Sequence, residues 1–188
     1  MKEHIFKIII LFIGIATLMV ACRPKAEAVI EPLKTTVVHA DWTRNMVLYE
    51  INVRQFSPEG TFAGVDSALP RLKELGVNVL WFMPIYPIGE LNRKGELGSY
   101  YSISDYKGVN PEFGTLEDFK ALVDRAHDMG FHVILDWVGN HSAWDNPLAT
   151  EFPEWYEKDS LGNLVSPFDW TDVIQFDYTA EPLWDYMA

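Results

Sequence analysis

One short pattern, a helix that ends at a glycine and is followed at once by an apolar run, occurs twice in the chain. Its copies are residues 75–80 (LGVNVL) and 129–134 (MGFHVI). A glycine just past the last turn is typical of a helix C-terminus, and a continuous apolar run is typical of a strand buried on both faces. With an earlier β-branched run at 46–53, the pattern predicts three strands separated by helices, and therefore a parallel α/β sheet with its strands side by side.

The strands are expected at Met46–Val53, Val77–Met83 and Phe131–Val138, and the second and third of them are expected to be buried. Apolar residues at helical spacing, from Val65 to Leu75, predict the first helix.

We expect Pro70 to lie in the first turn of that helix, with Ser67 as its N-cap, because an interior proline would break the helix. The second helix is expected to begin at Thr115, which with Asp118 forms a variant of the capping box.

Two long segments, 84–114 and 142–188, leave the C-terminal ends of the second and third predicted strands, and both are expected to be loops. This is the face on which α/β folds and barrels build their sites. Residues 136–188 hold 11 acidic residues, one basic residue and 11 aromatics. Aromatic rings stack on the C–H faces of sugars and carboxylates accept bonds from hydroxyls, so this composition suits a carbohydrate groove. An ordinary aromatic-pinned loop with a solvated acidic face fits it as well.

The overall charge argues against nucleic acid as a partner. The chain carries 15 Lys and Arg against 27 Asp and Glu, a net charge of −12, which repels a phosphate backbone. The single cysteine excludes an internal disulfide and a thiolate zinc cluster.

The first 21 residues are expected to be a signal peptide. Ile8–Val20 is an uncharged run of 13 residues, too short to span a bilayer, which takes about 20. The sequence LMVAC that ends at Cys22 resembles a bacterial lipobox, although Met19 departs from the usual leucine. We therefore expect a lipoprotein anchored to the membrane at Cys22, periplasmic or on the cell surface, with 22–40 as a linker. An ordinary signal peptide with an incidental cysteine is the alternative.

Three polar residues follow the third predicted strand. Asp136 lies near the end of that strand, where a carboxylate is costly to bury unless it is paired. Asn140 offers an amide oxygen suited to calcium, and His141 offers a ring N–H to a hydroxyl. Each also has a plain structural interpretation, with Asp136 as an anchor for the loop and His141 as a packing residue.

Four segments resemble, in order and spacing, the motifs of the α-amylase superfamily of glycoside hydrolases (family 13). Residues 136–141 (DWVGNH) match its D-x-x-x-N-H signature, and 76–84 (GVNVLWFMP) match its second-strand motif. Residues 110–115 (NPEFGT) resemble the stretch before its second helix. Residues 101–106 (YSISDY) resemble its G-Y-D-V-x-D-Y segment, with Tyr100 and Ser102 in place of the glycine and the first aspartate.

The resemblance implies a partial (β/α)8 TIM barrel. Residues 41–188 would hold its first three β-strands and the start of the domain-B-like excursion that follows strand three. The catalytic carboxylates of the family lie on strands four, five and seven. No catalytic residue is therefore expected here, and the chain is expected to be an inactive, truncated N-terminal part of the catalytic domain.

The resemblance also implies the activity of the parent enzyme, which is retaining hydrolysis of the α-glucosidic bonds of starch-like glucans and maltooligosaccharides. Tyr101 would stack on the sugar, His141 would donate to its hydroxyl, and Asp136 would hold the loop and the neighbouring catalytic strand. Asn140 would be a calcium ligand, in a site weakened by Gln175 where the family has an aspartate.

Two other functions remain open. One is a transglycosylase or trehalose-forming isomerase of the same family. The other is a non-catalytic, glycan-binding surface lipoprotein.

Overall fold

The computed structural model describes residues 38–188. The predicted signal peptide, the anchor Cys22 and the linker as far as residue 37 lie outside the described residues. No helix in the described part of the chain combines the length and the apolarity needed to cross a membrane.

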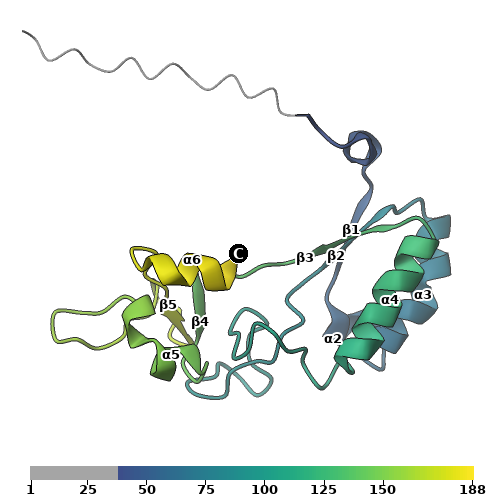
Figure 1. The fold of residues 1–188 in the computed structure, drawn as a ribbon. Helices are drawn as coiled ribbons and strands as arrows, with labels where there is room; N and C mark the ends of the chain where they lie inside the picture. The colour runs from purple at the N-terminus through teal and green to yellow at the C-terminus, as the bar shows by residue number, and fades with distance from the viewer. Residues whose placement is uncertain (1–37) are drawn as a thin grey trace, which may run out of the picture. The chain divides into compact units, whose positions relative to one another are not determined.

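Three parallel strands, β1 (Leu48–Ile51), β2 (Val79–Phe82) and β3 (His132–Leu135), form a sheet in the order β1-β2-β3. The crossovers run through α3 (Phe62–Glu74) and α4 (Leu116–Asp128), which lie next to each other against the sheet (Figure 1). The predicted parallel topology is confirmed. The first predicted strand is too long, because Val53 already begins the short helix α2 (Val53–Phe56).

The predicted start of α3 is wrong. Its N-cap is Thr61, whose hydroxyl accepts a hydrogen bond from the Gly64 N–H, and Pro70 lies in the interior of the helix. An interior proline costs about 3 kcal/mol. Burial of a large apolar side chain contributes about 1.5–3 kcal/mol each. The fully buried residues of α3 therefore outweigh the proline: Phe62, Val65, Leu69 and Leu72.

The other helix signals are confirmed. Thr115 and Asp118 form both hydrogen bonds of the capping box, at 3.1 and 2.8 Å. Gly76 and Gly130 follow the two helices at φ +83° and +78°, a left-handed conformation that an L side chain rarely adopts.

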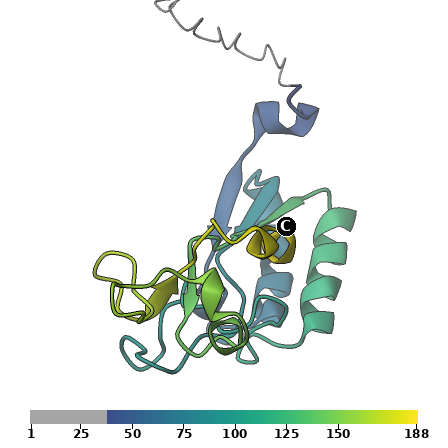
Figure 2. The same cartoon turned by 60° about the vertical axis from the view of Figure 1, so that its left-hand side comes forward.

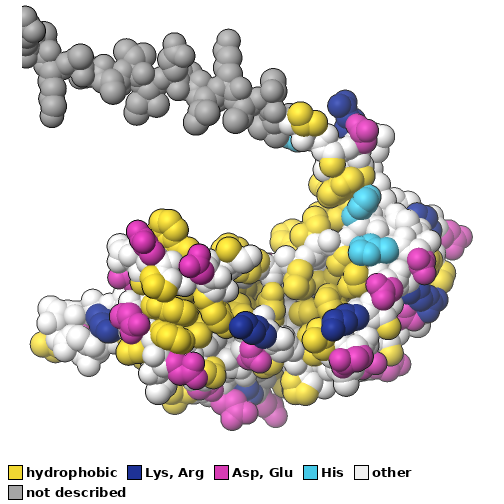
Figure 3. Space-filling model, viewed as in Figure 1, with side chains coloured by type: hydrophobic (Ala, Val, Ile, Leu, Met, Phe, Trp, Pro, Cys, Tyr) yellow, Lys and Arg dark blue, Asp and Glu magenta, His cyan; other side chains and the backbone are white. Residues whose placement is uncertain are grey.

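The main core lies between the sheet and these helices. Ile51, Leu80 and Phe82 pack there against the apolar faces of α3 and α4. The expectation that the third strand is buried is wrong, because Ile134 and Leu135 are each 36% exposed. β3 is an edge of the described sheet, and apolar side chains reach the surface beside the strands (Figure 3).

Residues 142–188, predicted to be a loop, form a small lobe instead. β4 (His141–Ala143) pairs antiparallel with β5 (Val173–Gln175), and three short helical segments flank the pair: α5 (Leu148–Glu151), η2 (Pro153–Trp155) and α6 (Glu181–Met187). The lobe is seen from a second side in Figure 2. Its own apolar cluster consists of Leu148, Trp155, Tyr156, Ile174, Phe176 and Leu183.

The predicted 84–114 loop is confirmed as largely irregular, and it is fastened to the lobe. The Ile103 carbonyl accepts hydrogen bonds from the Ala143 N–H (2.9 Å) and the Asn146 side chain (3.2 Å). Ile103 itself is fully buried. These hydrogen bonds hold Tyr101, two residues before Ile103, near His141 at the start of β4.

Candidate functional site

The four predicted site residues meet at the C-terminal ends of the strands. Tyr101 comes from the 84–114 loop, Asp136 follows β3 directly, Asn140 precedes β4, and His141 is the first residue of β4. All four line one hollow of about 310 Å³. The Tyr101 hydroxyl donates to Asp136 Oδ2 at 3.1 Å, so the carboxylate has the partner that its position requires.

His141 is almost fully buried and is held on two sides. The Asn140 side-chain nitrogen lies 3.1 Å from His141 Nδ1, and the ring of Trp170 meets the imidazole edge to face at 5.5 Å. Burial lowers the pKa of His141, while the Tyr101 backbone and the charge of Asp172 act in the opposite direction. The ring is therefore neutral at pH 7. The Asn140 amide donates to Nδ1, so the proton lies on Nε2.

The phenol of Tyr101 is held in its protonated form. Burial raises its pKa to about 12, and the charge of Asp136, the hydrogen bond to that carboxylate and the charge of Glu50 add to the rise.

Tyr101 is expected to stay protonated at about pH 11, where an ordinary tyrosine with a pKa near 10 ionises. Because the folded-state pKa is raised, the associated stability is complete below about pH 10 and is lost as the pH rises through 12. The ¹³Cζ NMR signal of labelled tyrosine measures the midpoint directly. Asp136→Asn should lower that midpoint, whereas a midpoint near 10 in the unsubstituted chain would contradict the geometry.

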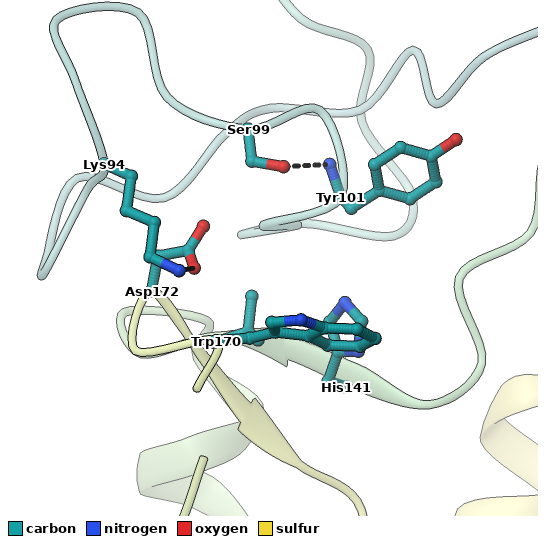
Figure 4. Close-up of a pocket in the computed structure, with 7 residues that line it drawn as sticks. Lys94, Ser99, Tyr101, His141, Trp170 and Asp172 are labelled. Atoms are coloured by element: carbon teal, nitrogen blue, oxygen red, sulfur yellow. Dashed lines mark hydrogen bonds and ion pairs between the residues drawn. The ribbon is translucent and has the colours of Figure 1, made fainter. Parts of the chain in front are cut away.

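A second, larger hollow adjoins the first. It measures about 420 Å³ and shares Tyr101, His141 and Trp170 with it (Figure 4). Its further lining residues are Lys94, Ser99, Asp172 and Val173. The aromatic richness of 136–188 pointed to rings such as Trp170. No signal in the sequence marked Lys94, which lies in an irregular loop 78 residues before its partner Asp172.

The predicted calcium site depends on the surroundings of Asn140 and Gln175. Its amide nitrogen faces His141, and the Gln175 amide donates to Glu157 at 3.2 Å. The described residues hold no group of three or more His, Cys, Asp or Glu side chains that could bind an ion. Calcium also binds amide and backbone carbonyl oxygens, so the calcium site at Asn140, weakened by Gln175, stays a prediction.

Helices after parallel strands, with a site at the C-terminal ends of those strands, are the architecture of (β/α)8-barrel enzymes. Comparison with known proteins supports the same architecture. The family model for the alpha amylase catalytic domain matches residues 32–177. The chain belongs to this family, and its fold is part of the family's TIM barrel, as the sequence motifs predicted.

Two solved structures and one curated relative show how far the similarity extends. An alpha-amylase from Lactobacillus plantarum is 54% identical, with a TM-score of 0.75, over 77% of this chain and 34% of that one. A maltogenic alpha-amylase from Thermotoga neapolitana is 41% identical, with a TM-score of 0.73, over the same shares. The alpha-1,4-glucan:maltose-1-phosphate maltosyltransferase of Rhodospirillum rubrum is 39% identical over 58% of this chain and 18% of its own length. The chain thus spans about a fifth of that curated relative.

Proposed function

We propose that this chain forms the sugar-binding side of an active site for α-glucans in a retaining glycoside hydrolase. The observation that carries the proposal is the meeting of Tyr101, His141 and Trp170 between two adjoining hollows. The aromatic rings of Tyr101 and Trp170 can stack on a sugar there, and the neutral imidazole of His141 has an N–H to donate to a sugar hydroxyl. Family membership and the two amylase structures support the same substrate class.

Each predicted residue has a role that fits its contacts. The ring of Tyr101 stacks on a glucosyl unit, and its hydroxyl is oriented by Asp136. His141 donates from Nε2 to a sugar hydroxyl, since Nδ1 is occupied by Asn140. Asp136 acts through Tyr101 and through the end of β3, where its N–H continues the ladder to the Phe82 carbonyl at 2.9 Å.

The chain by itself is proposed not to hydrolyse glucans. Retaining hydrolysis needs a nucleophilic carboxylate and an acid–base carboxyl about 5–5.5 Å apart. The two carboxylates that line the hollows are committed elsewhere, Asp136 to Tyr101 and Asp172 to Lys94. The reacting carboxyl groups of the complete enzyme must then come from other residues.

Glycosyl transfer is a second candidate. The similarity to a maltosyltransferase favours it, because the same binding side serves a reaction in which a sugar hydroxyl replaces water as the acceptor.

Calorimetric titration of the full chain tests the proposal. Maltotetraose is expected to bind at least about tenfold more tightly than cellotetraose, its β-linked isomer, a difference of about 1.4 kcal/mol. Neither sugar should be cleaved during the titration. Absence of maltotetraose binding at millimolar concentration would refute the proposed binding site. Cleavage abolished by Asp136→Asn would refute the proposed lack of activity.

A further inference from the structure

The two adjoining hollows differ in the side chains found at their outer ends. The smaller one is bordered by exposed aromatic rings, with Trp137 58% and Phe168 86% exposed. The larger one contains an ion pair at the end away from the Trp170 and His141 rings (Figure 4). A sugar chain that enters over the aromatic rings would therefore meet charged groups at the far end.

That ion pair joins the 84–114 loop to the lobe. Lys94 Nζ lies 3.2 Å from Asp172 Oδ1, and it also donates to the Asp169 carbonyl at 3.3 Å. The backbone of Asp172 is fixed in turn, because the buried Ser102 hydroxyl donates to its carbonyl at 2.9 Å. The pair is thus a fixed connection between the two segments, located within the lining of the hollow.

Ser102 also departs from the family pattern. It stands where the G-Y-D-V-x-D-Y segment of the α-amylase family has its first aspartate. Its hydroxyl donates to the Asp172 carbonyl, and Asp172 lines the hollow. The Asp172 side chain is 7% exposed and that of Lys94 is 50% exposed. A carboxylate buried to this extent needs a compensating partner, which Lys94 supplies.

The paired groups retain capacity for hydrogen bonds. An ammonium has three donors, of which two are used here, and a carboxylate can accept about four hydrogen bonds. Because the charges of the pair cancel, it favours a neutral ligand that both donates and accepts. Neighbouring hydroxyl groups of a terminal sugar have this character.

We propose that Lys94 and Asp172 close one end of the site and bind the terminal glucosyl unit of a linear α-glucan, so that the site selects chain ends. This inference rests on the proposed function and adds to it the part of the glucan that is recognised. A cyclic glucan has the same units and linkages but no end to place against the pair.

The test compares linear maltohexaose with cyclomaltohexaose, by calorimetric titration of the full chain. The linear sugar is expected to bind at least tenfold more tightly. Lys94→Met should reduce its affinity about tenfold, because a hydrogen bond from a charged group contributes about 1.5–3 kcal/mol. Binding of the cyclic sugar should not change.

Lys158→Met is the matched control, since Lys158 is exposed in the lobe and lines none of the described hollows. It should leave both affinities unchanged. Equal affinity for the two sugars, or a ratio that Lys94→Met does not alter, would overturn the inference and leave the proposed function standing. If neither sugar binds, the proposed function fails and the inference fails with it.

Discussion

Replacing Trp170 with alanine is expected to weaken the binding of maltohexaose about thirtyfold. Trp170 lines both hollows, as Tyr101 and His141 also do. The centroid of its ring lies 5.5 Å from that of the His141 imidazole. Truncation of a central tryptophan in a binding site typically costs 2 kcal/mol or more, and about 2 kcal/mol corresponds to a factor of about 30. Calorimetric titration of the two proteins measures the ratio.

Trp184→Ala is the control for this substitution. Trp184 is similarly exposed, at 55% against 42% for Trp170, but it lies on α6 and lines neither hollow. Its replacement should leave the affinity unchanged. A change of less than threefold for Trp170→Ala, or an equal loss for both variants, would mean that the sugar does not stack on Trp170.

Phe82→Ala is expected to lower the free energy of unfolding by about 3–5 kcal/mol, the usual cost of truncating a buried phenylalanine. Phe82 ends the central strand β2, is fully buried, and packs edge to face on Phe119 of α4 at 5.6 Å. Removal of its ring leaves a cavity between the sheet and the helices.

Urea unfolding followed by circular dichroism measures that loss. Leu161→Ala is the control, because Leu161 is 85% exposed and a surface change of this kind usually shifts stability by less than about 0.5 kcal/mol. A loss below about 1 kcal/mol for Phe82→Ala would contradict the position of β2 at the centre of the core.

The sheet was predictable because its signals are local. The position after α3 and α4 is left-handed, a conformation that favours glycine, and Gly76 and Gly130 mark it in the sequence. The capping box of α4 lies within four consecutive residues. The apolar run at Val79–Phe82 marks a central strand without reference to any distant contact. Such features specify the order of strands and helices, from which the parallel pairing follows.

The parts that could not be predicted depend on contacts between distant residues. Pro70 is tolerated inside α3 because the buried face of the helix outweighs its cost, and that burial exists only in the folded chain. β4 and β5 have three residues each, too few for a periodic pattern, and they form through pairing across some 30 residues.

The candidate site divides in the same way. Tyr101, Asp136, Asn140 and His141 were found through motifs, and the structure brings them into one hollow. Lys94 and Asp172 were not found, because an ion pair between two irregular segments leaves no pattern in either.

Mapping the sugar on the protein tests the central claim, that an α-glucan binds where Tyr101, His141 and Trp170 meet. Maltohexaose is added to the ¹⁵N-labelled full chain, and the amide shifts are followed by NMR. The structure predicts that the largest changes fall in residues 99–101, 136–141 and 168–173, the segments that supply most of the residues lining the two hollows. Changes confined to the outer lobe at 148–164, or no changes at saturating sugar, would contradict the account.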